Sequence, residues 1–151
     1  NLDINLIIIG DGPNYLKYQN YIIENNLQEK IKIIKKIQND ELPEYYRSCK
    51  IYIQALKNLD GIPIPVLEAM ACGLPIIMSK HDDSFSEIID SSVVYVENDS
   101  NQFKIAIEKL LKNENFMNEM KQKSQDIIKC ISADLMNEKE INLYNQLLKN
   151  K

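Results

Sequence analysis

Five short apolar runs rich in β-branched residues alternate with helical patterns up to residue 96, and this alternation limits the folds open to the chain. Continuous runs of this kind are typical of parallel strands that are covered on both faces. The order strand, helix, strand predicts a doubly wound α/β domain, a Rossmann-like and mostly parallel sheet of about five strands with helices on both faces. The predicted strands are 4–9, 31–37, 51–54, 75–79 and 93–96, and the predicted helices between them are 13–26, 40–49, 63–72 and 84–90.

The strand pattern stops after residue 96. Three further helices are predicted at about 100–113, 114–131 and 134–149, the first of them capped by Ser100. No internal repeat and no Gly/Ser-rich linker divides the sequence, so residues 1–151 are predicted to form one domain that ends in helices.

Composition excludes several classes of protein. A chain of 151 residues that is 44% hydrophobic and 26% charged is typical of a soluble globular domain. Its net charge of −4 argues against a nucleic-acid partner. Three widely spaced cysteines indicate reduced thiols and a cytoplasmic location, and the single histidine, His81, excludes a His-rich metal centre. No apolar run approaches the roughly 20 residues of a membrane span.

The stretch DGIPIPVLEAMACGLP, residues 60–75, follows the third predicted strand, where ligands of doubly wound sheets bind. Pro63 and Pro65 favour the first turn of a helix, and Gly61 lets an anion or a sugar approach the backbone. The N–H groups of Gly61, Ile62, Ile64 and Val66 are expected to be free, which predicts a phosphate-binding helix N-terminus.

Glu68 lies about one turn inside this helix, among apolar neighbours. A carboxylate can accept two hydrogen bonds side by side, so it suits the two hydroxyls of a ribose. The alternative is that Glu68 caps another element or pairs with a lysine. The sequence Gly-Asp-Gly-Pro at residues 10–13 has two interpretations, a tight strand-to-helix turn and a loop that contacts a ligand directly. Pro13, in the first turn of the following helix, favours the tight turn.

Residues 60–75 resemble the signature of the group 1 (family 4) retaining glycosyltransferases, in which an acid precedes a Glu that is followed by Ala-Met-Ala-x-Gly-x-Pro. Asp60 and Glu68 stand at the two acidic positions, although the family more often has Glu at the first. These enzymes pair two Rossmann-like domains, the GT-B arrangement, and the signature belongs to the C-terminal, nucleotide-sugar-binding domain. Most of the remaining chain is also similar to that domain, including the Gly-Asp-Gly-Pro turn.

The resemblance assigns roles to individual residues. Asp60 and Glu68 are the implied catalytic pair, Asp60 near the reacting carbon of the sugar and Glu68 on the ribose. The base would lie against the backbone near Lys35 to Ile37. The donor would be a UDP-sugar or a GDP-sugar, and neither a cofactor nor a metal is expected. The implied donor-binding residues are Gly12, Lys36, Ile37, Gly61, Ile62, Pro63, Ile64 and Glu68.

The chain also departs from the family pattern. The family's domain opens with one more strand and helix, which carry an Arg and a Lys that bind the diphosphate, so the sheet of this chain is expected to have a gap, a substitute or a foreign strand in that place. The Gly-Gly before the family's later Glu is replaced by residues such as Asp83 and Ser84. With the N-terminal acceptor domain absent as well, we expect this chain alone to be inactive.

The complete enzyme would transfer a hexose to a glycan or lipid acceptor, in polysaccharide or glycolipid biosynthesis. It could associate peripherally with a membrane. Two alternatives remain open: a non-catalytic nucleotide-binding or assembly module derived from this fold, and a sugar-nucleotide epimerase of similar architecture. The Ala-Met-Ala-Cys-Gly-Leu-Pro run counts against the epimerase.

Overall fold

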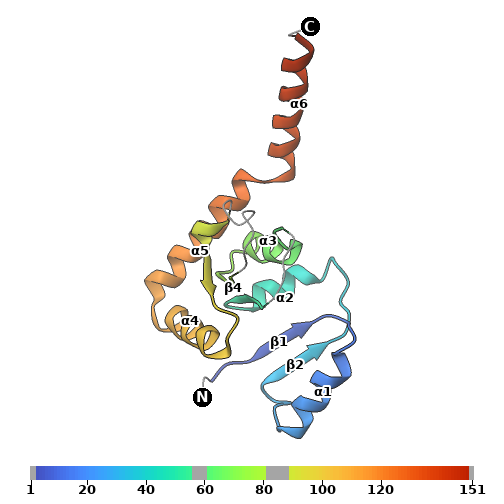
Figure 1. Cartoon of the computed structure of the whole chain (residues 1–151), viewed down its shortest axis with the longest axis vertical. Helices are drawn as coiled ribbons and strands as arrows, with labels where there is room; N and C mark the ends of the chain where they lie inside the picture. Colours follow the sequence, from blue (N-terminus) through green and yellow to red (C-terminus); the bar gives the residue numbers. More distant parts are fainter. Residues whose placement is uncertain (1–2, 56–60, 81–88, 150–151) are drawn as a thin grey trace. The chain divides into compact units, whose positions relative to one another are not determined.

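The computed structural model describes residues 3–55, 61–80 and 89–149. It shows an α/β protein whose paired strands are all parallel, which confirms the fold class predicted from the sequence (Figure 1). The chain forms two compact units, Asn1–Glu44 and Tyr45–Lys151. The described strands make two sheets, one of two strands and one of three.

The first unit is a strand, a helix and a strand. β1 (Leu6–Ile9), α1 (Tyr15–Glu24) and β2 (Ile31–Ile34) follow the predicted order, and the strands pair in parallel with Leu6 opposite Ile31. Ile22 is the one residue of this unit's described part that is buried, at 6% exposure. The apolar strands therefore make only a thin core here.

The second unit holds the main core. Its sheet has the order β3-β4-β5, with β3 (Tyr52–Gln54), β4 (Ile76–Ser79) and β5 (Val93–Val96) all parallel. Every residue of β4 is buried, as expected for a central strand that is covered on both faces. α2 (Leu42–Ser48) precedes β3, and the short 3₁₀ helix η2 (Asp90–Ser92) leads into β5.

Side chains of β4 alternate between two hydrophobic clusters, which places helices on both faces of this sheet. Ile76 and Met78 pack with α3 (Ile64–Ala71), while Ile77 packs with residues of α4 (Ser100–Lys112) and α5 (Glu114–Cys130). Ser124 of α5, fully buried, donates a 3.1 Å hydrogen bond to the Leu74 carbonyl oxygen and so joins α5 to the end of the signature motif.

Two helix ends show how the local sequence sets the boundaries. Gly73 has a φ of +76°, and its N–H donates to the Met70 carbonyl while the Leu74 N–H donates to Ala69, so it ends α3 as predicted. The prediction that Ser100 caps α4 was wrong. The cap is Asp99, whose carboxylate accepts from the N–H groups of Asn101 and Gln102, because Ser100 is already the first helical residue.

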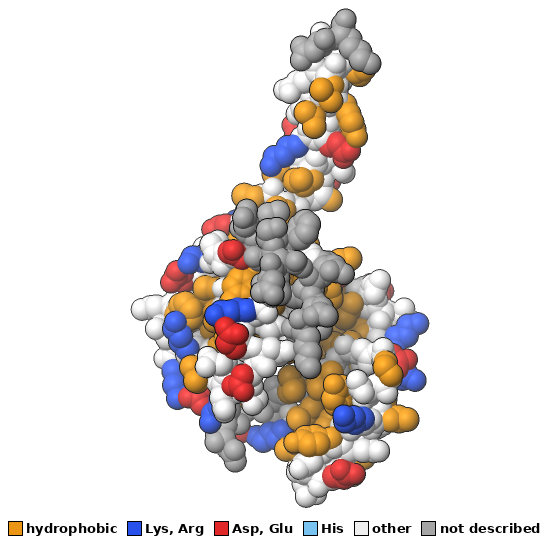
Figure 2. Space-filling model, in the orientation of Figure 1, with side chains coloured by type: hydrophobic (Ala, Val, Ile, Leu, Met, Phe, Trp, Pro, Cys, Tyr) orange, Lys and Arg blue, Asp and Glu red, His pale blue; other side chains and the backbone are white. Residues whose placement is uncertain are grey.

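The last helix, α6 (Ala133–Lys149), buries none of its residues. Apolar side chains are exposed along it, and elsewhere on the visible face acidic and basic side chains are interspersed (Figure 2). No helix within the described ranges has the length and apolar character needed to cross a membrane. The helix predicted at 84–90 lies largely outside the described residues.

Candidate functional site

The N-terminus of α3 is built by glycine and proline. The helix begins at Ile64, directly after Pro63, which has extended backbone angles and no side chain that could cap the helix. Gly61 has a φ of +87°, a conformation that favours glycine, and a Cβ there would meet nothing within 4 Å. Space is therefore open beside the backbone at the start of this helix, and the side chain of Ile64 is 70% exposed.

Four N–H groups at the start of this helix are predicted from the sequence to be free, and the structure differs from this prediction at Val66. The Val66 N–H donates a 2.9 Å hydrogen bond to the Pro63 carbonyl oxygen, which closes the first turn, so Val66 is not a free donor. Within the described part of the chain, the N–H groups of Gly61, Ile62 and Ile64 have no acceptor. These three donors remain at the positive end of the helix dipole.

Glu68 lies one turn further along α3, and its side chain is exposed instead of buried. Its Oε2 accepts a 2.9 Å hydrogen bond from the hydroxyl of Tyr46 on α2. No lysine or arginine of the described residues forms an ion pair with it, so a tyrosine takes the place of the lysine partner considered above. The buried residues of α3 are Val66, Ala69 and Met70, and Ala71 is exposed.

Two half-buried tyrosines stand beside Glu68. The rings of Tyr46 and Tyr52 are 5.9 Å apart between centroids and tilted by 57°. The pKa of Tyr46 lies well above its ordinary value. Burial is the largest cause, and the hydrogen bond to Glu68 and the charge of Glu68 contribute next. Burial, and to a smaller extent the charge of Glu68, raises the pKa of Tyr52 to about 12. Both hydroxyls are therefore protonated at neutral pH. Sequence reasoning missed Tyr46, since nothing in the sequence indicates a contact between residues on two separate helices.

The remaining candidates lie in the first unit, beyond the carboxyl ends of β1 and β2. The Gly10 N–H donates a 2.9 Å hydrogen bond to the Ile34 carbonyl oxygen, which brings the two loops together. Gly12 lies in the first loop, with open space where a Cβ would be. Lys36 is exposed and Ile37 half-buried in the second loop. An ion pair of 3.6 Å between the Lys35 ammonium and the Asp11 carboxylate also joins the second loop to the first.

The structure therefore groups the predicted site residues in two sets. Gly61, Ile62, Pro63, Ile64 and Glu68 share the start of α3 in the second unit, and Gly12, Lys36 and Ile37 share a loop edge in the first. Asp60, predicted as catalytic, lies outside the described residues, as do His81, Asp83 and Ser84.

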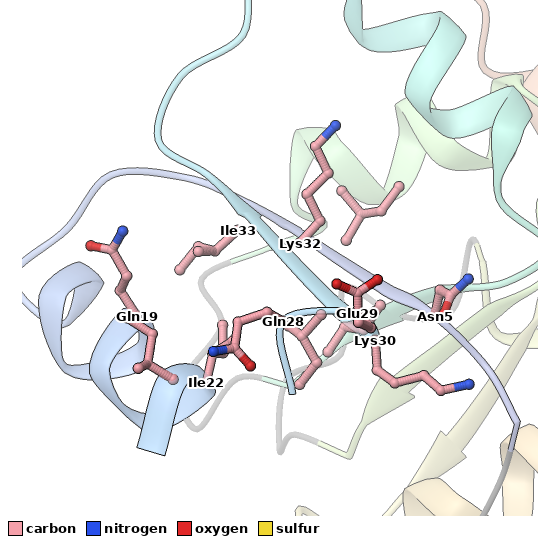
Figure 3. Close-up of a pocket in the computed structure, with 12 residues that line it drawn as sticks. Asn5, Gln19, Ile22, Gln28, Glu29, Lys30, Lys32 and Ile33 are labelled. Atoms are coloured by element: carbon pink, nitrogen blue, oxygen red, sulfur yellow. The ribbon is translucent and has the colours of Figure 1, made fainter. Parts of the chain in front are cut away.

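A cavity of about 630 Å³ lies in the first unit, between α1 and the two strands. Gln19 and Ile22 of α1, Gln28 before β2 and Lys32 of β2 are among its lining residues (Figure 3). None of the predicted site residues lines it. No group of three or more His, Cys, Asp or Glu side chains in the described ranges could hold a metal ion.

The fold is that of the C-terminal domain of GT-B glycosyltransferases. The structure of HepE from Anabaena in complex with UDP superposes with a TM-score of 0.79 over 95% of this chain and 41% of that chain, at 16% identity. The C-terminal domain of LpcC, a group 1 glycosyltransferase from Francisella tularensis, superposes with a TM-score of 0.70 at 25% identity, over 84% of this chain and 69% of that one.

The family model for glycosyl transferases group 1 matches residues 1–127, and the chain belongs to this family. An uncharacterised glycosyltransferase of Methanocaldococcus jannaschii is 26% identical over 134 residues, which cover 87% of this chain. The match spans only 38% of that relative's length.

Proposed function

We propose that this chain is the donor-binding part of a retaining glycosyltransferase, which transfers a hexose from a UDP-sugar or a GDP-sugar to a glycan or lipid acceptor. The observation that carries the proposal is the start of α3, where three N–H donors without an acceptor in the described residues precede the exposed carboxylate of Glu68. Membership of the glycosyltransferase family supports this reading over the epimerase. The UDP complex of a protein with this fold supports a nucleotide as the ligand.

The chemistry follows from charge. A departing nucleoside diphosphate gains negative charge in the transition state, and N–H groups at the positive end of a helix stabilise it without a metal ion. In this proposal the N–H groups of Gly61, Ile62 and Ile64 face the diphosphate, while Glu68 accepts from the ribose. Asp60 contacts hydroxyls of the transferred sugar near its reacting carbon.

The first unit would receive the base. Gly12, Lys36 and Ile37 lie at the carboxyl ends of two parallel strands, where doubly wound sheets bind ligands. Contacts through the backbone at Lys36 and Ile37 would discriminate little between uracil and guanine, so both nucleotides belong in the test. The acceptor would bind to an N-terminal domain, and the enzyme would act in the cytoplasm, in peripheral association with a membrane.

Calorimetric titration of the full-length protein with UDP and with GDP tests the proposal. The wild type is expected to bind at least one of them. Glu68→Ala removes a charged acceptor of two hydrogen bonds and should weaken that binding roughly 10- to 100-fold. Glu138→Ala, which removes an exposed helical glutamate of α6, is the matched control and should leave binding unchanged. Equal binding by wild type and Glu68→Ala would show that the ribose does not lie at Glu68.

A further inference from the structure

Glu68 is an exposed side chain with a fixed partner. Exposed glutamates ordinarily sample several rotamers, and immobilising one on binding a ligand costs conformational entropy. Here the Tyr46 hydroxyl of α2 donates a 2.9 Å hydrogen bond to Oε2 of Glu68 on α3. The carboxylate is thus held in one orientation before any ligand arrives.

Tyr46 is itself held in place. Its ring packs against the cluster formed by α3, β4 and their neighbours, and it lies 5.9 Å from the ring of Tyr52. The Tyr52 hydroxyl donates to Oε1 of Gln54, so it is engaged within its own strand. Tyr46 is therefore the tyrosine of this pair that holds the carboxylate.

The hydrogen-bonding capacity of Glu68 leaves room for a ligand. A carboxylate has about four lone-pair sites on its two oxygens, and Tyr46 occupies one of them. Within the described residues the side chain of Glu68 accepts from no other donor. Two neighbouring hydroxyls of a ribose could therefore bind while the bond from Tyr46 persists.

We propose that Tyr46 is a positioning residue, which orients the Glu68 carboxylate toward the ribose hydroxyls and so makes the site select ribonucleotides over deoxyribonucleotides. The proposal rests on the function proposed above, because it requires a ribose at Glu68. It concerns a contact between α2 and α3 that lies outside the signature motif of residues 60–75.

The experiment compares nucleoside diphosphates with their 2′,3′-dideoxy forms, for uridine and guanosine, by calorimetry on the full-length protein. The wild type is expected to bind the ribose form at least about tenfold more tightly. Tyr46→Phe keeps the ring and removes the donor, so it should weaken the ribose form roughly 5- to 10-fold and leave the dideoxy form unchanged. In donor kinetics the same variant should raise KM with little change in kcat.

The matched control is Tyr45→Phe, which removes a neighbouring hydroxyl on α2 that makes no hydrogen bond to Glu68, and it should retain the wild-type selectivity. Selectivity kept in full by Tyr46→Phe would overturn the role of Tyr46 while leaving the ribose at Glu68. Equal binding of both forms by the wild type would overturn the ribose placement, and the role of Tyr46 with it. A loss of affinity for both forms alike would show that Tyr46 acts only by supporting the fold.

Discussion

At the scale of single residues, the motif predicted the position of Glu68 on its helix but not its surroundings. Glycine, two prolines and the Ala-Met-Ala run determine a short helix with a glutamate one turn inside, and the structure has this helix. That Glu68 is exposed and accepts from Tyr46 depends on how α2 packs against α3. Such a contact between residues far apart in sequence has no periodic signal.

Tyr52 gives a pH-dependent prediction. Burial and the nearby charge of Glu68 raise the pKa of Tyr52 in the folded protein to about 12, above the ordinary value of 10.0. The folded state therefore keeps this proton where the unfolded state loses it. The resulting stabilisation is complete below pH 10 and is lost as the pH rises from about 10 to about 12.

The measurement is the absorbance of tyrosinate during an alkaline titration of wild type and Tyr52→Phe. The difference between the two curves should be centred near pH 12. The variant should also lose less stability between pH 10 and 12 than the wild type does. A difference curve centred near the ordinary tyrosine value would contradict the burial of this hydroxyl beside Glu68.

At the scale of elements, the hydrophobic pattern predicted the order of strands and helices and missed details at their ends. β5 has the predicted bounds, whereas β1 begins later than its apolar run, at Leu6, and β2 ends earlier than its run, at Ile34, because the two strands pair only over these residues. The N-terminus of α4 shows a different kind of error. Asp99 and Ser100 are both good capping residues, and only the backbone angles show which of them precedes the helix.

Asp99→Ala should lower the free energy of unfolding by about 1 kcal/mol, the usual cost of losing a capping side chain. The carboxylate accepts from the N–H groups of Asn101 and Gln102, at 3.0 and 3.2 Å, and also lies at the positive end of the helix. In thermal unfolding this corresponds to a decrease in Tm of roughly 2–4 °C for a chain of this size.

Ser100→Ala is the matched control for the cap. Ser100 is the first residue within α4 and makes no capping hydrogen bond, so this change should alter Tm little. Asp99→Asn should retain most of the stability, because asparagine caps helices about as well as aspartate. A larger loss for Ser100→Ala than for Asp99→Ala would restore the assignment made from the sequence.

At the scale of the whole molecule, the two units differ in how much core they have. The central strand of the second unit, β4, is buried along its whole length and lies between two hydrophobic clusters. In the described part of the first unit, which has two strands and one helix, Ile22 of α1 alone is buried. The sequence did not predict this difference, because the apolar runs of β1 and β2 are as rich in isoleucine as those of the second unit.

Hydrogen exchange should detect this difference as local opening. An amide exchanges by low-energy local opening where that opening exposes little apolar surface. A two-stranded sheet with a thin core is marginally stable, so its amides are expected to exchange in this way. Two pairs of amides with similar hydrogen bonds isolate the effect of the core. In the first pair, the Leu6 N–H donates to the Lys30 carbonyl oxygen at 2.8 Å, and the Tyr52 N–H donates to the Pro75 carbonyl oxygen at 3.0 Å. In the second pair, the Gly10 N–H donates to the Ile34 carbonyl oxygen at 2.9 Å, and the Lys80 N–H donates to the Val96 carbonyl oxygen at 2.8 Å.

The protection factors of Tyr52 and Lys80 should exceed those of Leu6 and Gly10 by about a hundredfold or more, since the hydrogen bonds are alike while the hydrophobic cores of the two units differ. Equal protection in both pairs would mean that the two units open together, as one cooperative body. Saturation with UDP or GDP adds a second measurement. If the nucleotide contacts Gly12, Lys36 and Ile37 as proposed, the amides of Leu6 and Gly10 should gain protection, because a ligand that binds only the closed form stabilises that form.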